Sequence, residues 1–490
     1  MEAFSEKCEV AVNEKLGRHF VAAVDISVGD VILEEKPLLI TPHWECFDMK
    51  CSQCYDNSYI ICKKCRVFPL CLYCTTHNEF DCNFFQKKAK HISKNLLVKN
   101  YGIYALLKLL LTMENPATFG QCEPLLLSEK CNLDEYRERD PLKFFELTDN
   151  VVDPLLDSGI VKLFTIKSSV HKMDADFLLK MCIQIDANIR CLDCTSDSLK
   201  GVYVGASQLP HSCVPNTAIA IANDFQMKIY ATVPIERGAI IYSSYTNPMM
   251  GTIQRQHHLR ATKNIECACS RCLDPTELGT HMSSMKCQKC LVGYAVCDLN
   301  NTKNWICTEC ASVILKTEVD KLQENLAQQI ADRKDNLDWY ESILATYSTY
   351  FHRQHFLIID IKQNIVTILR KFFSVKTRLS KRFLQRRVQL CGEFLPLVRT
   401  VLPGVSKLHA IALYEYLMPF LELTQLEWED EDISLDVFLR KQKMALEIAT
   451  AALKMLSFAP ANSPEGELME HIGMFRRLIQ ETITKFSIEK

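Results

Sequence analysis

Cysteines in pairs, each pair separated by two residues, fill one short stretch near the start of the chain. Together with a histidine they make eight residues able to bind a metal: Cys51, Cys54, Cys62, Cys65, Cys71, Cys74, His77 and Cys82. A tetrahedral zinc ion takes four thiolate or imidazole ligands, and a Cys-x2-Cys pair supplies two of them from one tight turn. The stretch therefore predicts a module that binds two zinc ions. Buried or disulfide-bonded cysteines are the alternative, and the paired spacing argues against it.

Two further cysteine sets occur beyond the middle of the chain. Cys267, Cys269 and Cys272 offer three ligands, and a structural zinc site needs a fourth. Cys213 is the best candidate, because it lies in the polar, turn-forming run 209–216. The other set has the four-thiolate spacing of a zinc ribbon and consists of Cys287, Cys290, Cys307 and Cys310. The sequence thus predicts three to four zinc ions.

The expected compartment also favours zinc over disulfides. Residues 1–15 are charged throughout and lack the apolar core of a signal peptide, so the cysteines are expected to stay reduced. No apolar run is long enough to cross a bilayer, and we expect a soluble intracellular protein, cytoplasmic or nuclear, that does not bind membranes. The 57 basic and 59 acidic residues nearly cancel, which argues against direct nucleic-acid binding despite the basic loop 63–66.

Apolar periodicity divides the chain into a β-rich part and a helical part. Short strands are expected at 20–24, 31–33, 218–221 and 225–233. The segment 233–241 repeats the strand-turn-strand shape of 24–32. Helices are expected from 101 to 180 and from about 317 onward, with a break at 402–404. The predicted fold class is α+β, with stacked amphipathic helices, in the manner of a tetratricopeptide array, at the C-terminal end.

Several of these features occur in an order that resembles the SET and MYND domain-containing protein methyltransferases. In chain order they are Gly17-Arg18 before a strand, the eight-ligand finger after 31–37, the run His211-Ser212-Cys213-Val214-Pro215-Asn216, the pair Ser244-Tyr245, and the cysteines of 267–272. The resemblance covers essentially the whole chain, and the ribbon is similar to that of the arthropod branch of the family. It implies a SET β domain split by an inserted MYND zinc finger and a helical insert, then a post-SET zinc site, the ribbon and an all-helical, tetratricopeptide-like C-terminal domain.

The resemblance also implies how the chain is divided. The expected segments are the two SET parts 1–45 and 186–250, the finger 46–85, the helical insert 86–185, the post-SET zinc site 251–275, the ribbon 276–315 and the C-terminal domain 316–490. In the family's interleaved finger, one ion would be held by Cys51, Cys54, Cys71 and Cys74, and the other by Cys62, Cys65, His77 and Cys82.

The activity implied by the resemblance is S-adenosylmethionine-dependent methylation of a lysine in a histone or non-histone protein. A neutral amine displaces the methyl group from the sulfonium, so the protein mainly orients two reactants and excludes water. Tyr245 matches the family's catalytic tyrosine, which also faces the cofactor. Arg18, Asn188 and His211 match cofactor-binding positions, and the backbone of 207–211 would hold the adenosine end.

Departures from the family pattern fall at the expected cofactor pocket. Pro210 stands in place of asparagine, His19 in place of glycine, and Ile265 and Lys263 in place of aromatic residues. Each change could cost about 1–3 kcal/mol of cofactor binding. Two hypotheses follow. The chain is an active lysine methyltransferase, which the retained Tyr245 favours, or it is a weak or inactive adaptor whose finger binds proline-rich peptides and whose helical domain binds other proteins.

Overall fold

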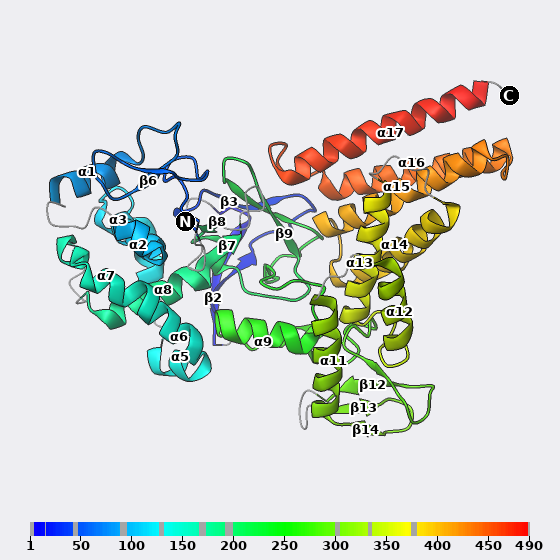
Figure 1. Cartoon of the computed structure of the whole chain (residues 1–490), viewed down its shortest axis with the longest axis horizontal. Coiled ribbons are helices and arrows are strands. Elements are labelled where there is room, and N and C mark those ends of the chain that lie inside the picture. Colours follow the sequence, from blue (N-terminus) through cyan, green and yellow to red (C-terminus); the bar gives the residue numbers. More distant parts are fainter. Residues whose placement is uncertain are drawn as a thin grey trace.

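The computed structural model describes residues 4–14, 16–42, 48–88, 96–126, 132–165, 173–191, 199–298, 304–331, 336–373 and 380–488. A helical lobe that carries the zinc finger, a central group of strands and a lobe of long helices lie side by side (Figure 1). The boundary expected between 45 and 46 falls outside the described residues. No helix within these ranges is both long enough and apolar enough to span a membrane.

The central strands come from two stretches that are far apart in the sequence. They are β1 (Cys8–Asn13), β2 (Gly17–Ala22), β3 (Val31–Glu35), β4 (Leu39–Pro42), β7 (Ile189–Cys191), β8 (Leu199–Val202), β9 (Thr217–Ile221) and β10 (Met227–Ala231). They form the hairpin β1–β2 and two three-stranded sheets with the orders β3-β10-β9 and β4-β8-β7. Because β3 pairs antiparallel with β10, one sheet joins the start of the chain to residues that follow the insert. The prediction of a split β domain is confirmed.

The two segments of similar shape, 24–32 and 233–241, lie against each other. Ile26 and Ile235 exchange backbone hydrogen bonds with N···O distances of 2.8 and 2.9 Å. The last residues of the second segment do not form the expected strand, and Ile240 makes an isolated bridge to Val21 of β2. The carbonyl of Ile240 instead accepts a hydrogen bond from the side-chain amide of Asn216, at 2.9 Å.

The insert between the two SET parts is helical, as predicted. Its elements are α2 (Leu96–Lys99), η1 (Tyr101–Ile103), α3 (Tyr104–Glu114), α4 (Phe119–Leu126), α5 (Leu133–Arg139), α6 (Pro141–Leu147), η2 (Thr148–Val152), α7 (Asp153–Asp157), η3 (Ile160–Leu163) and α8 (Ala175–Asn188). The run of leucines in the sequence lies on helix α3, which is buried nearly all round. The leucines at 106, 107 and 109–111 are at most 1% exposed. The finger packs on this helix, and Tyr104 donates a hydrogen bond to Ser52 of the finger at 3.1 Å.

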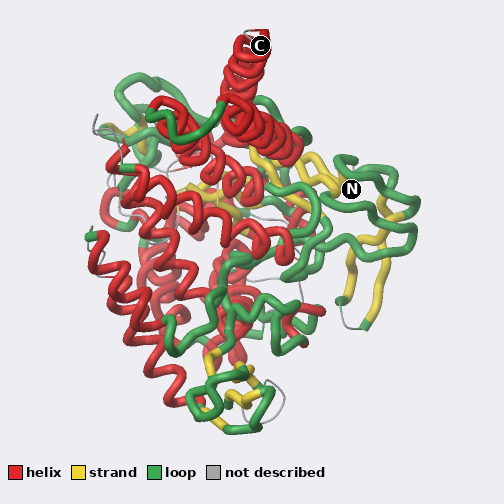
Figure 2. Tube along the Cα trace, turned by 90° about the vertical axis from the view of Figure 1, so that its right-hand side faces the viewer, coloured by secondary structure: helices red, strands yellow, loops and turns green. Residues whose placement is uncertain are grey.

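The finger and the region after the SET strands contain the small elements that carry cysteines. They are β5 (Ile60–Ile61), β6 (Pro69–Leu70) and α1 (Glu79–Lys88) in the finger, α9 (Thr252–Lys263) and α10 (Ser270–Leu273) after the SET strands, and β11 (Met285–Lys286), β12 (Tyr294–Cys297), β13 (Trp305–Cys307) and β14 (Val313–Ile314) in the ribbon. The four ribbon strands form one sheet in chain order. They lie at the foot of the C-terminal helices (Figure 2).

Long helices make up the C-terminal lobe, as predicted from the apolar stripes. They are α11 (Lys316–Ala331), α12 (Leu337–Tyr347), α13 (Phe356–Phe373), α14 (Lys381–Val401), α15 (Lys407–Glu429), α16 (Leu435–Leu456) and α17 (Pro464–Ile488). Serines begin three of them, since Ser380, Ser406 and Ser434 each accept a hydrogen bond from a first-turn N–H. Helix α14 ends at the predicted break, where Gly404 has a φ of 79°.

The C-terminal lobe docks on the sheet β3-β10-β9 through backbone contacts. Val405 N donates to Thr232 O at 3.1 Å, and Asn223 N donates to Asn462 O at 2.7 Å. Glycine is needed beside the first contact, because a Cβ on Gly404 would lie 2.0 Å from the oxygen of Thr232. The position of this glycine therefore sets how closely the lobe approaches the sheet.

We predict that Gly404→Ala destabilises the protein by about 2–4 kcal/mol, because an L side chain disfavours positive φ and the added methyl overlaps the Thr232 carbonyl. Urea unfolding followed by circular dichroism measures the change. The matched control is Gly473→Ala in α17, where an added Cβ meets nothing within 4 Å. That variant should be as stable as the parent or slightly more so. Equal loss in both variants would contradict the packing argument.

Candidate functional site

Four clusters of metal-ligating side chains are present in the described part of the chain. The sets are Cys51, Cys54, Cys71 and Cys74; Cys62, Cys65, His77 and Cys82; Cys213, Cys267, Cys269 and Cys272; and Cys287, Cys290, Cys307 and Cys310. Within each set the candidate ligand atoms lie within 4.8 Å of one another. Tetrahedral zinc with Zn–S bonds of about 2.3 Å places its sulfur ligands about 3.8 Å apart. All four clusters therefore fit a zinc ion, and none of the described cysteines forms a disulfide.

The finger clusters interleave along the chain in the expected way. Cys54 Sγ and Cys71 Sγ are 3.6 Å apart in one cluster, and Cys62 Sγ and Cys82 Sγ are 3.9 Å apart in the other. His77 points its Nε2 at Cys65 Sγ, at 3.3 Å. Burial lowers the pKa of His77 to about 4, which keeps the imidazole in the neutral form that binds zinc. The ribbon cluster has the same spacing, with Cys290 Sγ and Cys307 Sγ at 3.7 Å.

The post-SET cluster joins the turn that contains Cys213 to three cysteines around α10. Cys213 Sγ lies 3.5 Å from Cys272 Sγ and 4.0 Å from Cys267 Sγ. A fully buried guanidinium completes this cluster, because Arg255 Nε donates to Cys213 Sγ at 3.2 Å. The sequence pattern gave no reason to single out this arginine. Its contact explains how the negative charge of four thiolates around one Zn²⁺ is tolerated in the interior.

Arg255 belongs to a buried ion cluster with Arg271 and Glu277. The carboxylate Oε2 of Glu277 lies 2.8 Å from an Arg255 nitrogen and 2.9 Å from an Arg271 nitrogen. All three side chains are at most 1% exposed. Burial alone would raise the pKa of Glu277, but the two guanidiniums lower it below its ordinary value. The carboxylate is thus held ionised between two cations.

Two chain segments interlock beside this cluster and place the predicted catalytic residue. Ser212 N donates to Ser243 O, and Ser243 N donates to Pro210 O, both at 3.0 Å. The side chain of Asn216 bonds both ends of the second segment, by donating to Ile240 O at 2.9 Å and accepting from Tyr242 N at 2.7 Å. Tyr245 follows directly, so its backbone is fixed by the interlocked turns.

His211 connects the zinc cluster to Tyr245. Its Nδ1 accepts from Tyr245 N at 3.0 Å, so its Nε2 carries the proton and donates to Cys213 Sγ at 3.3 Å. The hydroxyl of Tyr245 donates to the carbonyl of Leu209. Tyr245 therefore faces the backbone of 207–211, the segment expected to hold the adenosine end of a cofactor. The structure brings Tyr245 and His211 together as the sequence suggested.

The other two predicted cofactor residues come from separate elements. Arg18 is exposed on β2. Asn188 is the last residue of α8 and donates to Gln184 O at 2.7 Å. The carbonyls just before it, on Asp186 and Ala187, accept from Lys263, whose ammonium lies 5.7 Å from the centre of the Tyr245 ring. Lys263 thus links the end of α8 to Tyr245. From the sequence, Lys263 was noted only because it replaces an aromatic residue of the family pattern, and this contact could not be foreseen.

The departures Pro210 and His19 have local explanations. Pro210 uses its carbonyl in the interlocked turns and has no N–H to donate to a ligand. His19 is 3% exposed, and its Nδ1 lies 2.9 Å from Gly17 O, so the imidazole folds back on its own hairpin. Ile265 packs with Tyr245 against the post-SET cysteines and fills space as an apolar side chain.

We predict that Arg255→Met destabilises the protein by about 3–5 kcal/mol and speeds the loss of zinc to a chelator, because Glu277 and the Cys213 thiolate lose a buried cation. Urea unfolding and a colorimetric zinc-release assay measure the two effects. Arg260→Met on the same helix is the control, since Arg260 and its partner Glu266 have side chains 50% and 79% exposed. That change should cost less than about 1 kcal/mol. Similar results for both variants would contradict the assigned role of Arg255.

Comparison with known proteins agrees with this architecture, although no family model matches the chain. The SET domain-containing protein SmydA-8, isoform B, of Drosophila melanogaster is 23% identical over 379 residues, covering 73% of this chain and 79% of the relative. The histone-lysine N-methyltransferase ASHR1 of Arabidopsis thaliana is 20% identical over 425 residues, covering 81% of this chain and 83% of the relative.

A third relative is named for both a SET domain and a MYND domain. A SET and MYND domain-containing protein of Dictyostelium discoideum is 29% identical over 119 residues, which cover 24% of this chain and 35% of the relative. The split β domain, the interleaved finger and the post-SET cluster occur together in the structure. In these features, and in its relatives, the chain is similar to the SET and MYND domain-containing proteins.

Proposed function

We propose that the chain is an S-adenosylmethionine-dependent protein-lysine N-methyltransferase. The observation that carries the proposal is the placement of Tyr245, whose backbone is tied to the post-SET cluster through His211 and whose hydroxyl faces a main-chain carbonyl. A tyrosine held in this way can position an amine without moving during the reaction. Relatives from Arabidopsis thaliana and from yeasts are named histone-lysine N-methyltransferases.

The surroundings of Tyr245 fit a cationic cofactor and a lysine side chain. S-Adenosylmethionine, when bound, supplies an electrophilic methyl group on a sulfonium cation. The carbonyls of Ser207 and Leu209 lie at the tyrosine hydroxyl, and those of Asp186 and Ala187 already accept from an ammonium. Carbonyl oxygens and the face of an aromatic ring both stabilise cations. These groups create the negative potential that such a pair of reactants requires.

The chain's own residues would act mainly by orienting the acceptor amine and the cofactor. The Tyr245 hydroxyl donates to Leu209 O, and its oxygen can still accept a hydrogen bond from an acceptor amine. The apolar side chains of Leu259 and Ile265, packed beside Tyr245, help to exclude water from this region. The amine that attacks must be neutral, so its proton passes to solvent before transfer. Arg18, Asn188, His211 and Tyr245 remain the proposed cofactor contacts, and the sixteen cysteine and histidine ligands the proposed zinc ligands.

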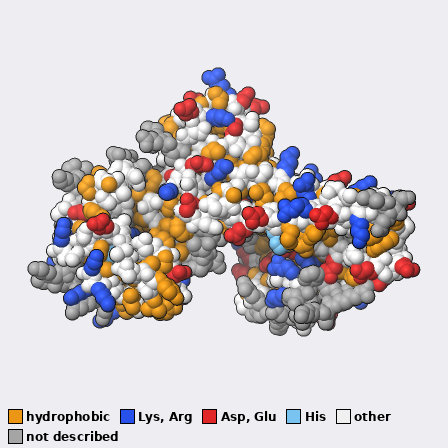
Figure 3. Space-filling model, turned by 90° about the horizontal axis from the view of Figure 1, so that it is seen from above, with side chains coloured by type: hydrophobic (Ala, Val, Ile, Leu, Met, Phe, Trp, Pro, Cys, Tyr) orange, Lys and Arg blue, Asp and Glu red, His pale blue; other side chains and the backbone are white. Residues whose placement is uncertain are grey.

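A protein partner suits the surface better than an extended polyanion. On the face seen in Figure 3, basic and acidic side chains are intermingled. The finger exposes large apolar side chains, with Tyr59 69%, Leu72 68% and Tyr73 92% accessible. Exposed aromatic rings are the surfaces on which proline-rich segments dock. We therefore include a proline-rich peptide as a proposed ligand of the finger.

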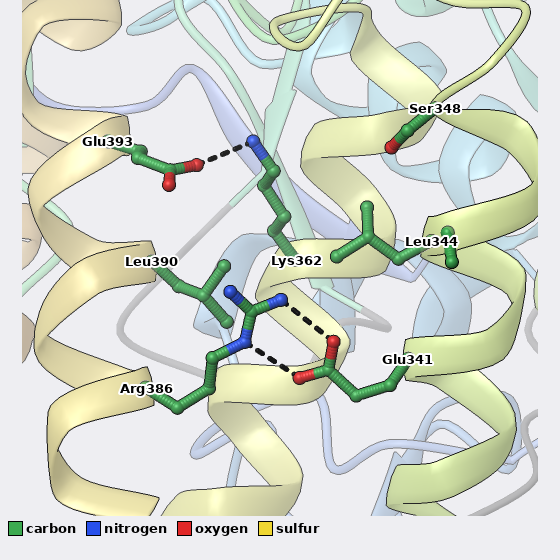
Figure 4. Close-up of a pocket in the computed structure, with 8 residues that line it drawn as sticks. Glu341, Leu344, Ser348, Lys362, Arg386, Leu390 and Glu393 are labelled. Carbon is green, nitrogen blue, oxygen red and sulfur yellow. Dashed lines mark hydrogen bonds and ion pairs between the residues drawn. The ribbon is translucent and has the colours of Figure 1, made fainter. Parts of the chain in front are cut away.

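An adaptor without transferase activity is the second candidate, and Pro210 is the observation that favours it. The helical lobe offers a candidate partner site of its own, an open pocket of about 280 Å³ lined by residues of α12, α13 and α14 (Figure 4). Two ion pairs line the pocket. Arg386 binds Glu341 through two hydrogen bonds of 2.8 and 2.7 Å, and Lys362 binds Glu393 at 2.7 Å. Such a pocket would bind a partner side chain that carries both polar and apolar groups.

We predict that S-adenosylmethionine binds the zinc-loaded chain with micromolar affinity, measured by isothermal titration calorimetry. Pro210→Asn should bind about tenfold more tightly, because it restores a backbone donor and a side-chain amide at the pocket. Tyr245→Phe keeps the aromatic ring and removes only the hydroxyl. It should therefore still bind the cofactor but lose methyl transfer to a mixture of core histones, measured with a labelled methyl group.

The outcomes separate the two candidate functions. Binding by the unaltered chain, with transfer abolished in Tyr245→Phe, supports the enzyme. If S-adenosylmethionine binds only after Pro210→Asn, the natural chain has lost its cofactor site and the adaptor is the better description. Binding that is unaffected by Pro210→Asn would show that neither a backbone N–H nor a side-chain amide at position 210 is needed.

A further inference from the structure

Lys263 presents an ammonium group to the ring of Tyr245. It is the last residue of α9, is half-buried, and donates to the carbonyls of Asp186 and Ala187 at the end of α8. Its Nζ lies 5.7 Å from the centre of the Tyr245 ring. Two carbonyl acceptors and an aromatic face are the features of an ammonium-binding site. The chain therefore contains an ammonium-binding site, and Lys263 of the chain itself occupies that site in the structure.

The backbone around Lys263 is fixed on both sides. Asn264 adopts a left-handed conformation with φ of 52°, which ends α9, and its side chain donates to Glu135 Oε1 at 3.1 Å. Gln256 and Cys267 exchange two hydrogen bonds, of 2.6 and 3.3 Å, and Cys267 is a candidate zinc ligand. Lys263 thus lies in a short segment held between the helical insert and the post-SET cluster. Its direction toward Tyr245 is set by the fold.

We infer that the ammonium of Lys263 takes the position of an acceptor amine beside Tyr245, so that the chain carries an internal competitor for its substrate lysine. This inference rests on the proposed function. A substrate lysine must displace Lys263 from the Asp186 and Ala187 carbonyls before its own amine reaches Tyr245. Lys263 thereby selects for protein segments that bind strongly enough elsewhere on the surface to force this exchange.

The inference has an electrostatic consequence that does not require a known substrate. An acceptor amine must lie next to the sulfonium of S-adenosylmethionine, so a fixed ammonium in that position repels the cofactor. S-Adenosylhomocysteine is a neutral thioether and feels no such repulsion. Two positive charges a few ångströms apart in a partly buried site repel each other. This repulsion is strong enough to change the ratio of the two ligands' affinities about tenfold. The chain should therefore prefer S-adenosylhomocysteine, and Lys263 should cause that preference.

The test is calorimetric titration of both ligands into the zinc-loaded chain, Lys263→Met and Lys263→Arg. Methionine has an unbranched side chain one atom shorter than lysine and removes the charge, whereas arginine keeps the charge. We expect Lys263→Met to raise the affinity for S-adenosylmethionine relative to S-adenosylhomocysteine about tenfold. Lys263→Arg should leave the ratio close to that of the parent.

Each result decides the question. An unchanged ratio in Lys263→Met, with both ligands still bound, overturns the inference and leaves the proposed function intact. A similar rise in both variants also overturns it, because the charge would then not be the cause. If neither ligand binds any of the three chains, or Pro210→Asn, the proposed function fails and the inference falls with it.

Discussion

The carboxylate of Glu277 is the group around which the middle of this molecule is organised. One of its oxygens pairs with Arg255 and Arg271, and the other accepts from Thr252 N and the hydroxyl of Ser283. An isolated charge of this kind could not remain in the interior, since the cost of removing an ion from water is several kcal/mol. Here each charge has a partner, and the partners belong to α9, α10 and the start of the ribbon. The cluster therefore fixes these three parts relative to one another.

The same ion cluster leads to the proposed catalytic tyrosine by direct contacts. Arg255 donates to the Cys213 thiolate, His211 donates to the same sulfur, and the other nitrogen of His211 accepts from the backbone of Tyr245. A zinc ion in the post-SET cluster would make this arrangement rigid, because it would hold the sulfur at a fixed distance from three other ligands. In the proposed function, the metal site would thus orient the pocket without lying among the reacting groups.

Sequence reasoning succeeded where the relevant residues are neighbours in the chain or follow a fixed spacing. The zinc clusters could be predicted because ligand type and Cys-x2-Cys spacing report directly on coordination geometry, and the helical lobe because its apolar stripes repeat at helical intervals. The buried arginines could not be predicted, since nothing in a sequence distinguishes Arg255 in the interior from Arg260 at the surface of the same helix. The contact of Lys263 with α8 depends on how two distant helices end, which no local pattern encodes. The segment 239–241 makes only an isolated bridge to β2 where a strand was expected, and the contact of its Ile240 carbonyl with the distant Asn216 side chain could not be read from the local pattern.

The pairing of β3 with β10 also has a consequence for how the chain is made. Strand β3 leaves the ribosome early, but its partner is synthesised only after the finger, the insert and β9. The finger gathers its ligands from a short stretch and the insert buries its own leucines, so both can fold while β3 still waits. During that interval the early strands expose unpaired edges and apolar faces to other chains. An unfinished chain thus exposes the edge of β3 to wrong strand pairing until β10 has been made.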